Sequence, residues 1–375
     1  MKQIAIVGAG LMGRLCALSL RRLGHDVCLY DKDNRDGHLS AARAAAGLLT
    51  PLGESFCCDP WVVDIGFVAL ERWPILLNTL KQEVFFQQAG TLVLAHQQDS
   101  GDLVRFSRHL DQHWSHKQAL WLRASQINEL EPQLAKGFAQ GLYLPEEGQI
   151  SGRDLLKALA FELDELGVKW HENTQVKQVE PHKVWFESGK GNESCEDFDW
   201  VIDCRGLGAH KQLTDLRGVR GEVFHLHAPE VELNRPVRLV HPRYQLYIAP
   251  KPDHQFMVGA TEIESDDMGP MTVRSALELL SAAYSVHSGF AEARIVEQIS
   301  QCRPAFSDNH PQIQFKPGLI SVNGLYRHGY LLAPVVLDHV MELLESGIDE
   351  QDIDSTFEFS QMIKPQQVND VQEAS

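Results

Sequence analysis

The sequence predicts an α/β fold, in which a part built on a parallel sheet is interleaved with a mostly antiparallel β part. Three glycine-rich strand ends support this prediction. One follows the apolar run at 4–7, one follows the buried-type strand at 200–203, and one follows the strand at 319–322. Segments in which apolar and polar residues alternate lie between them, at 222–227 and 245–260. Such alternation is typical of half-buried antiparallel strands.

The N-terminal segment has the order strand, helix, strand. The apolar run at 4–7 leads into the spacing G-x-G-x-x-G, and residues at helical spacing follow at 14–23. Gly24 ends this stretch, a second strand is expected at 26–30, and Asp31 closes that strand. This order predicts a complete βαβ unit that binds a nucleotide.

Each glycine of the motif has its own physical task in such a unit. Gly8 makes the tight turn, Gly10 lets the backbone approach a pyrophosphate, and Gly13 lets the helix pack close to the strand. The helix N-terminus then faces the phosphates, and the Asp31 carboxylate reaches a ribose hydroxyl. A chance glycine-rich turn is the alternative, but it would not explain why strand, helix and acid all stand at the required positions.

Length and charge restrict the class of protein. A chain of 375 residues can bury more than one core, which favours two domains. The formal net charge of −17 would oppose binding to nucleic acid and to an anionic membrane surface. No apolar run is long enough to span a bilayer, so we expect no integral membrane contact.

The cysteines and the first strand indicate the compartment. Seven cysteines are scattered along the chain and form no C-x-x-C pair, which favours reduced thiols over disulfides or a zinc site. The first strand begins so close to Met1 that we expect no signal peptide. The sequence thus predicts a cytoplasmic protein without a metal. The adjacent Cys57 and Cys58 could be redox-active, or they could be buried thiols without a role.

Further elements follow from the residue pattern. A stretch of small residues at 40–49 would let the backbone run close to a large, flat group. Apolar residues at helical spacing predict helices at 61–80, 124–130, 153–166, 274–285 and 335–345. Strands are expected at 84–86, 90–95, 168–170, 175–179, 200–203, 222–227, 245–249, 256–260 and 319–322. The first two of these strands are expected to form a hairpin.

FAD is the cofactor that suits this order. One βαβ motif at the N-terminus, with glycine-rich strand ends late in the chain, fits a long cofactor that lies across several loops. The helix expected after 324–334 would point its positive end at the flavin and stabilise the negative charge that reduction places on N1 and C2=O. An NAD-dependent dehydrogenase is one alternative, and an ordinary β–α turn at 324–334 is another.

The same positions predict an interleaved architecture. A Rossmann-like FAD-binding domain would take three pieces of the chain, 1–82, 150–218 and 302–362. A mostly antiparallel β domain that binds the substrate would take the pieces between them, 83–149 and 219–301. A polar tail would remain at 363–375.

Five segments, together with the N-terminal motif, resemble the D-amino-acid-oxidase family of flavoproteins. They are AAAG at 44–47, YIAP at 247–250, VGAT at 258–261, RP at 303–304 and YRHGYLLAP at 326–334. Within this family the sequence is most similar to glycine oxidases of the ThiO type, and the resemblance extends to about residue 350. It implies the FAD-dependent oxidative deamination of glycine and other small amines, such as sarcosine and D-alanine.

The resemblance also implies the course of this reaction and its partners. Hydride would pass from the substrate Cα to flavin N5, and O2 would reoxidise the flavin and give H2O2. Water would turn the imine into a 2-oxo acid and ammonia, unless a thiazole-forming enzyme of thiamine biosynthesis captured it first. No enzymic base is needed. We expect a homo-oligomer, and FAD bound without a covalent link, because no cysteine lies at 324–334.

Three residues match catalytic positions of the family. Arg303 matches the arginine that binds the substrate carboxylate, for which a planar guanidinium offers two parallel hydrogen bonds. Tyr247 matches a tyrosine whose hydroxyl contacts the same carboxylate, and Arg327 matches an arginine beside flavin and substrate. A structural ion pair of Arg303 and a core position of Tyr247 are the alternatives.

Other positions match substrate or cofactor contacts. On a strand at 245–249, Gln245 and Tyr247 share a face, and Leu48 and Glu262 are also expected beside the substrate. FAD is expected to contact Gly8, Gly10, Leu11, Met12, Gly13, Asp31, Lys32, Arg43, Ala45, Ala46, Gly47, Leu48, Val176, Cys204, Gly206, Arg303, Gly324, Arg327, His328, Gly329, Tyr330, Leu331 and Leu332. His328 could tune the flavin or merely shape a turn.

Two departures from the family pattern leave the preferred amine open. Glu262 stands where a related glycine oxidase has methionine, and its carboxylate could pair with the substrate ammonium or lie in a solvated loop. Gln245 stands where a histidine is expected. A D-amino-acid dehydrogenase, a sarcosine oxidase, and a flavoprotein without turnover that acts as a maturation partner are the alternative functions.

Overall fold

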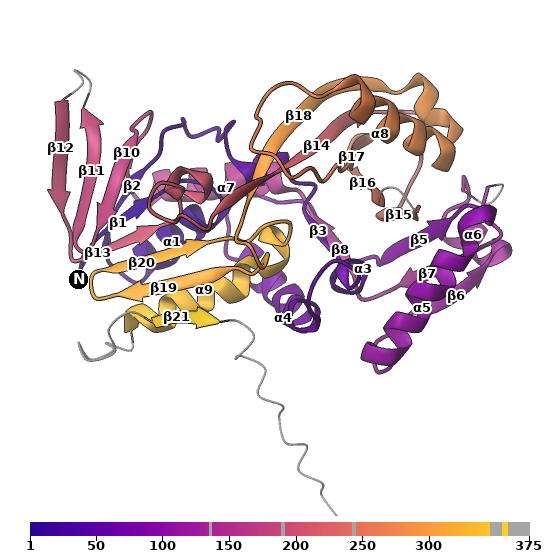
Figure 1. Ribbon diagram of the computed structural model, residues 1–375, viewed down its shortest axis with the longest axis horizontal. Coiled ribbons are helices and arrows are strands. Elements are labelled where there is room, and N and C mark those ends of the chain that lie inside the picture. Colours follow the sequence, from indigo (N-terminus) through magenta and orange to yellow (C-terminus); the bar gives the residue numbers. More distant parts are fainter. Residues whose placement is uncertain (135–136, 189–191, 242–244, 346–354, 359–375) are drawn as a thin grey trace, which may run out of the picture.

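The structure is a computed structural model that describes residues 1–134, 137–188, 192–241, 245–345 and 355–358. Over these residues the chain has a mixed α/β fold, and two large sheets lie next to each other along the longest axis of the molecule (Figure 1). The expected polar tail at 363–375 lies outside the described residues. Within the described ranges, we find no helix that is both long and apolar enough to span a bilayer.

The first large sheet has seven strands in the order β21-β19-β20-β13-β1-β2-β9. Strands β20, β13, β1, β2 and β9 run parallel, and β19 and β21 add antiparallel pairings at one edge. The bounds are β1 Gln3–Val7, β2 Asp26–Tyr30, β9 Lys169–His171, β13 Trp200–Asp203, β19 Gln312–Lys316, β20 Leu319–Asn323 and β21 Ser355–Glu358.

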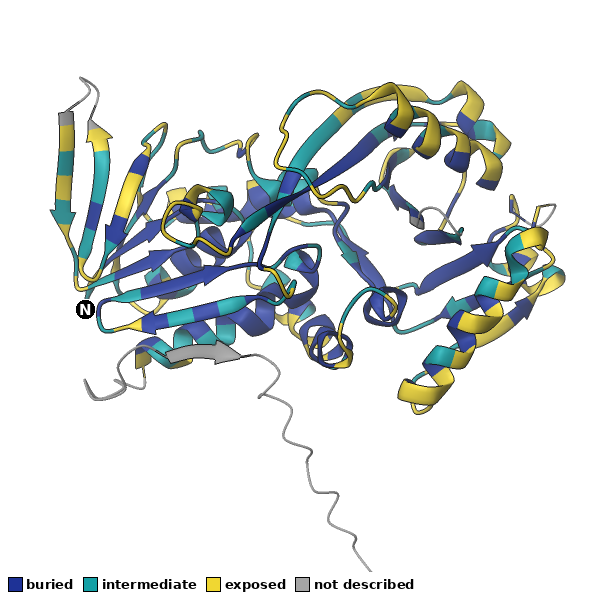
Figure 2. Ribbon diagram, viewed as in Figure 1, coloured by how far each residue is buried: buried dark blue, intermediate teal, exposed yellow. Residues whose placement is uncertain are grey.

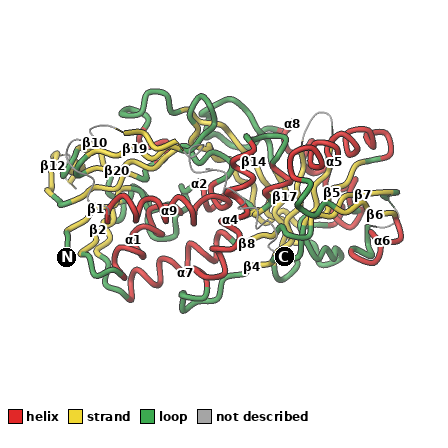
Figure 3. Tube along the Cα trace, turned by 90° about the horizontal axis from the view of Figure 1, so that it is seen from below, coloured by secondary structure: helices red, strands yellow, loops and turns green. Residues whose placement is uncertain are grey.

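Both faces of this sheet are covered. In β1, Ile4 and Ile6 face the core shared with the helices, whereas Ala5 and Val7 face a small antiparallel sheet, β10-β11-β12. The helices are α1 Leu11–Arg22, α4 Pro60–Leu77, α7 Gly152–Glu165 and α9 Gly329–Glu345, and Figure 3 shows α1, α7 and α9 together beside β1 and β2. The small sheet has the strands β10 Val176–Glu180, β11 Lys183–Ser188 and β12 Asn192–Asp197. Burial on both faces explains why β1 is an uninterrupted apolar run.

The second large sheet has eight strands in the order β18-β14-β17-β16-β15-β5-β7-β6. Its pairings are antiparallel except for β15 with β5. The bounds are β5 Thr91–Ala95, β6 Leu120–Arg123, β7 Gln140–Leu144, β14 Arg217–His227, β15 Val237–Val240, β16 Gln245–Lys251, β17 Gln255–Gly259 and β18 Arg294–Ala305. The helices α5 Ser100–Trp114, α6 Ala124–Leu130 and α8 Val273–Val286 accompany this sheet, and Figure 2 shows their exposed outer faces.

A third, short sheet lies between the two large ones and corrects one prediction. It has the order β3-β8-β4, with β3 Leu48–Leu49, β4 Phe86–Gln87 and β8 Gly148–Ile150. Strand β4 pairs with β8, while β5 pairs with β7 and β15. The predicted hairpin of 84–86 with 90–95 is therefore wrong, because each strand finds its partner far along the chain.

The last helix also differs from its prediction. It begins at Gly329 and contains Pro334, whereas the sequence pattern predicted a start at 335. Proline has no N–H, so Pro334 cannot donate to the carbonyl of Tyr330, four residues before it. The Trp73 indole of α4 donates to this carbonyl instead, at 2.9 Å. The proline is thus accommodated because a neighbouring helix supplies the missing donor.

This arrangement makes Trp73 a hydrogen-bond donor that the fold needs. We expect Trp73→Phe to lower the free energy of unfolding by about 1–3 kcal/mol beyond the loss of ring volume, because a buried carbonyl loses its partner. In a Pro334→Ala background, the backbone N–H of residue 334 can donate to the Tyr330 carbonyl, so Trp73→Phe should lower the free energy of unfolding by less. Denaturant unfolding of the four proteins measures the difference. Equal costs in both backgrounds would contradict the assignment.

Candidate functional site

A cavity of about 980 Å³ lies where the two large sheets meet. Its volume is near the upper end of the ~300–1,000 Å³ typical of ligand pockets. The lining comes from distant parts of the chain: the loops after β1, β2, β13 and β20, the segment at 44–57, and strands of the second sheet. Such a site exists only when the whole chain is folded.

Most of the residues expected in the site line this cavity. They are Gly8, Gly10, Leu11, Met12, Asp31, Lys32, Ala45, Ala46, Gly47, Leu48, Cys204, Gly206, Tyr247, Glu262, Arg303, Arg327, His328, Gly329, Tyr330 and Leu331. The side chain of Gln245 lies outside the described residues. The expected contact of Gln245 with a substrate therefore stays a prediction.

Five expected FAD contacts lie outside the cavity lining, each for a visible reason. A Cβ on Gly13 would overlap the carbonyl of Gly8, so this glycine serves the contact between α1 and β1. Arg43 forms an ion pair with Glu297 at 3.0 Å. The other three pack in the interior: Val176 in the core below the small antiparallel sheet, Gly324 against Phe306, and Leu332 in the helix core.

The nucleotide end of the cavity fits the expected FAD. Gly8 has φ +99°, and a Cβ there would lie 2.5 Å from the carbonyl oxygen of Cys204, so the turn requires glycine. The Asp31 carboxylate accepts hydrogen bonds from the backbone N–H groups of Ala9 and Asp33, the latter at 2.7 Å. Burial raises the pKa of Asp31, while these two bonds oppose the rise. A glycine turn, a helix N-terminus and a fixed carboxylate are the groups with which a βαβ unit binds a dinucleotide.

Arg303 carries an uncompensated positive charge into the cavity. It lies on β18, and its Nη1 and Nη2 donate to the carbonyl oxygen of Thr261 at 3.3 Å, with Nη1 also 3.4 Å from the carbonyl oxygen of Arg220. A Cβ on Gly221 would lie 2.5 Å from Arg303 Cζ, so glycine leaves the space that the guanidinium occupies. No carboxylate of the described ranges forms an ion pair with Arg303. An anionic ligand would supply the missing charge.

The Tyr247 side chain lies beside this arginine. Tyr247 is on β16, and a Cβ on Gly259 of the adjacent strand would lie 2.7 Å from its hydroxyl. Burial raises the pKa of Tyr247, while the positive charges of Arg303 and Arg327 lower it. The net rise keeps the hydroxyl protonated at neutral pH, so it can donate a hydrogen bond to an anion.

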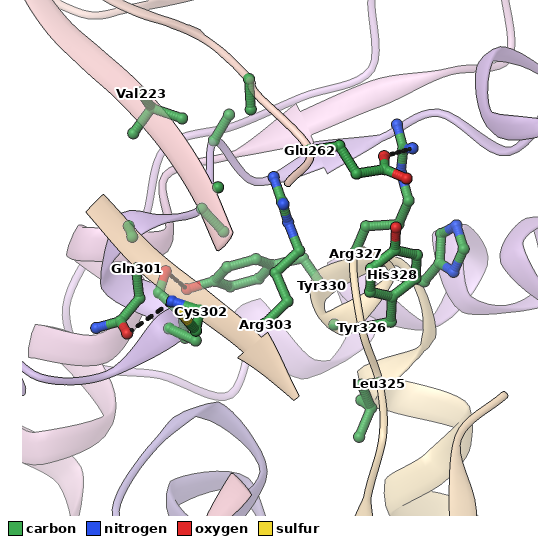
Figure 4. A pocket seen from close by; sticks show the side chains of 18 of the residues that line it. Val223, Glu262, Gln301, Cys302, Arg303, Leu325, Tyr326, Arg327, His328 and Tyr330 are labelled. Atoms are coloured by element: carbon green, nitrogen blue, oxygen red, sulfur yellow. Dashed lines mark hydrogen bonds and ion pairs between the residues drawn. The ribbon is translucent and has the colours of Figure 1, made fainter. Parts of the chain in front are cut away.

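Arg327 has two acidic partners, in contrast to Arg303. Its Nε lies 2.8 Å from Glu54 Oε2, and its Nη1 lies 2.7 Å from Glu262 Oε2. Burial alone would lower the pKa of Arg327, but these acids raise it above its usual value. Figure 4 shows the Glu262–Arg327 ion pair at the end of the cavity toward which the Arg303 guanidinium points. The structure therefore pairs Glu262 with a protein cation, where the sequence suggested a substrate ammonium.

Sequence reasoning missed a buried charge cluster beneath this pair. Glu54 accepts a hydrogen bond from Arg238 of β15 and forms an ion pair with Arg327, and His328 Nε2 lies 3.6 Å from Glu54 Oε2. Burial alone would raise the pKa of Glu54, but the two arginines hold it well below its usual range. Burial lowers the pKa of His328, so its imidazole is neutral at neutral pH. The available signal was a single arginine within the apolar strand at 237–240.

Glu147 adjoins this cluster and has a different charge state. It is fully buried, and its Oε1 accepts from the backbone N–H of Gly53 at 2.7 Å. Among the described residues, Glu147 Oε2 has no hydrogen-bond partner. Burial raises the pKa of Glu147 to about 7, against the opposing effects of the Gly53 bond and Arg238. Glu147 is therefore protonated in slightly acidic solution, next to a carboxylate that stays ionised.

Comparison with known proteins gives a consistent result over nearly the whole chain. The family described as FAD dependent oxidoreductase, DAO, matches residues 3–343. The thiamine biosynthesis oxidoreductase ThiO of Rhizobium etli is 38% identical over 351 residues, which cover 93% of this chain and 99% of that protein. A glycine oxidase of Geobacillus kaustophilus is 26% identical, over 91% of this chain and 92% of its own.

A solved structure shares the fold. The crystal structure of glycine oxidase from Geobacillus kaustophilus superposes with a TM-score of 0.79, at 24% identity, over 92% of this chain and 95% of that one. At this level of identity the likeness concerns the fold. It includes both large sheets, because almost all of each chain is covered.

The raised pKa of Glu147 makes stability depend on pH. A carboxyl whose pKa is raised on folding stabilises the fold fully below its unfolded value of about 4.5, and this contribution is lost as the pH rises through about 7. We expect the free energy of unfolding of Glu147→Gln, relative to that of the unsubstituted protein, to rise by roughly 3 kcal/mol as the pH goes from 4.5 to 8. Thermal unfolding across this range measures the gain.

The neighbouring residue provides the control for this prediction. Glu146 forms an ion pair with Lys117 at 3.1 Å and is partly exposed. Glu146→Gln removes the same charge from a partly exposed position, so its unfolding over the same pH range gives the reference curve. A Glu147→Gln difference that follows the reference curve would show that the buried carboxyl does not titrate near pH 7.

Proposed function

This chain belongs to the family of FAD dependent oxidoreductases, DAO, and on this premise we propose that it oxidises glycine and other small amines. The amine would become an imine while O2 becomes H2O2, and water would convert the imine into a 2-oxo acid and ammonia. Sarcosine and D-alanine are the other substrates that we propose. The observation that carries the proposal is the Arg303 guanidinium, which faces the cavity without an acidic partner among the described residues.

The cavity residues support bound FAD, which we propose is held without a covalent link. The turn at Gly8, the N-terminus of α1 and the Asp31 carboxylate would hold the nucleotide part. The segment at 45–48 and the start of α9 would contact the flavin. When bound, FAD supplies the two-electron acceptor for oxidation of the amine. The predicted pieces 1–82, 150–218 and 302–362 would form its domain.

The substrate would bind through its carboxylate. Arg303 offers two N–H groups on one edge, and the Tyr247 hydroxyl adds a third donor from β16 of the same sheet. Binding at these groups would hold the substrate in one orientation and so lower the entropic cost of reaching the reactive geometry. We infer no enzymic base: the protein would accept the amine in its neutral form, and its residues would act by position and charge.

The wider context is proposed from the relatives. The similarity to a thiamine biosynthesis oxidoreductase supports a role in supplying the imine of glycine for the thiazole of thiamine. A thiazole-forming enzyme would then be the partner that captures the imine before water does. We also propose a cytoplasmic homo-oligomer, with 83–149 and 219–301 as the substrate-binding domain.

The proposed activity predicts a spectroscopic change. Anaerobic addition of glycine to the purified holoenzyme should bleach its flavin absorbance, because the amine passes two electrons to the cofactor. Admission of O2 should restore the absorbance and release one H2O2 for each imine formed. Glycolate, which has a carboxylate but no amine, is the control and should not bleach the flavin. Bleaching by D-alanine or sarcosine but not by glycine would replace the proposed substrate.

The role of Arg303 can be tested on its own strand. Arg303→Met should lower kcat/KM for glycine by about 30-fold or more, chiefly through KM, because loss of a buried charge partner costs about 2–5 kcal/mol. Flavin occupancy should be retained. The control is Arg294→Met, which removes an exposed arginine of β18 outside the cavity and should leave the kinetics unchanged. Equal kinetics of both variants would remove Arg303 from the substrate site.

A further inference from the structure

We propose that Glu262 restricts this site to amines with one carboxylate, because it occupies the arginine that would otherwise bind a second carboxylate. This inference rests on the proposed function and concerns the substrate class of the same site. Arg303 and Arg327 both line this end of the cavity, and they differ in their partners. Arg303 is open to a ligand anion, whereas Arg327 is closed by Glu54 on one edge and by Glu262 on another.

The backbone holds Glu262 beside both arginines. Its neighbour Thr261 accepts hydrogen bonds from Arg303 through the carbonyl oxygen. On the other side, Ile263 exchanges two backbone hydrogen bonds with Arg220 of β14, at 2.8 and 3.0 Å. The segment is thus fixed to the sheet on both sides of Glu262. Its carboxylate reaches Arg327 from a fixed base at the cavity wall.

The segment has a further attachment through the Thr261 side chain. The Thr261 hydroxyl accepts from the backbone N–H of Glu222 at 2.9 Å and donates to the Glu222 carboxylate at 3.0 Å. Glu222 in turn accepts from Arg220 at 2.7 Å. These bonds involve β14 and leave the Glu262 carboxylate free to face Arg327. A substitution of Glu262 therefore removes its ion pair with Arg327 and leaves the attachments through Thr261 and Ile263 in place.

With the adjoining Glu147 protonated, the charges at this end of the cavity sum to one positive charge. The cations are Arg238, Arg303 and Arg327, and the anions are Glu54 and Glu262. The buried His328 imidazole is neutral at neutral pH. One ligand carboxylate therefore balances the site, and a second one would be left without a partner in a region where an unpaired charge is costly.

Exposure shows which partner of Arg327 a ligand could replace. The Glu54 side chain is 10% exposed and forms an ion pair with Nε. The Glu262 side chain is 50% exposed and bonds Nη1 from the open side. Removal of Glu262 would expose Nη1 to the cavity, and Glu54 would still hold the guanidinium in place. An amine with two carboxylates could then span Arg303 and Arg327.

Two unreactive ethers distinguish the binding of one carboxylate from the binding of two. Ethoxyacetate and diglycolate share one carboxylate and the ether oxygen, and they differ in a methyl group that is replaced by a second carboxylate. Neither has an amine that can be oxidised. Their dissociation constants are measured from the change of flavin absorbance in the holoenzyme, at fixed ionic strength. The proteins are the unsubstituted chain, Glu262→Gln, Glu262→Met, and Glu264→Gln as the control.

Glu264 is a matched control because it is an acid two residues further along. Its carboxylate pairs with Arg217 at 3.0 Å and does not line the cavity. Its substitution removes the same charge from the same segment. Flavin occupancy and the thermal midpoint, measured on every variant, show whether the fold is kept, and Glu262→Met provides a second neutral variant of similar length.

The expected result is a change of selectivity. The unsubstituted chain and Glu264→Gln should bind ethoxyacetate more tightly than diglycolate. In Glu262→Gln and Glu262→Met, the affinity for diglycolate relative to ethoxyacetate should rise about tenfold or more. As a second readout, kcat/KM for iminodiacetate relative to glycine should rise in the same variants.

Three results would overturn the inference. These are a selectivity within twofold of the unsubstituted chain in both Glu262 variants, an equal gain in Glu264→Gln, and the absence of diglycolate binding in every Glu262 variant. Each can occur while glycine still bleaches the flavin. Conversely, a failure of glycine to bleach the flavin would contradict the proposed function and leave the measured selectivity intact.

Discussion

The chain of ion pairs Arg238–Glu54–Arg327 connects the parts of the molecule between which the cavity lies. Arg238 belongs to the second large sheet, Glu54 ends the short helix α3 Pro51–Glu54, and Arg327 lies between β20 and α9 of the first sheet. Burial of such charges costs free energy unless every partner is present. Loss of the Glu54 carboxylate would leave Arg238 without its carboxylate partner and Arg327 with Glu262 alone, so the relative position of the three elements is tightly specified. These ion pairs therefore determine the shape of the cavity at this end.

Arg303 and Arg327 differ in the charge of their neighbours. Arg303 lies where backbone carbonyls accept its hydrogen bonds and where Gly221 leaves room for its guanidinium. These neighbours bind the guanidinium without neutralising its charge. Arg327 lies where two carboxylates converge. Residue type alone makes the two equivalent. The difference in their charge balance comes from the acids that the fold brings to Arg327.

Local patterns predicted the elements whose cause is local. Strand β2 and helix α6 have the expected bounds, 26–30 and 124–130, because alternation and helical spacing are properties of neighbouring residues. The βαβ unit was predictable for the same reason, since the glycine at position 8 is required within its own turn. The fold class followed from the positions of three such strand ends along the chain.

The failures have a common physical origin in contacts between distant residues. The pairing of β4 and β5 was wrong because their partners lie beyond 140 in the sequence. The start of α9 was wrong because the donor that replaces the Pro334 N–H is Trp73. The Glu54–Arg238 pair was missed because 184 residues separate its members. Arg303 and Tyr247 were expected from the resemblance, but only the folded chain shows that no carboxylate of the described part pairs with Arg303.

The charge of the whole chain and the charge of the cavity have opposite signs, and this decides what the site can select. A net charge of −17 does not attract an anionic substrate from a distance. At physiological ionic strength, exposed charges further away than about 8 Å are largely screened, so the groups that face the ligand dominate its binding. Those groups are three guanidinium groups and two carboxylates in a largely buried region. Because pairing is short-range and nearly complete there, a single carboxylate at Glu262 changes the number of ligand charges that the site can balance. Selectivity in this enzyme therefore depends on which protein acid reaches Arg327.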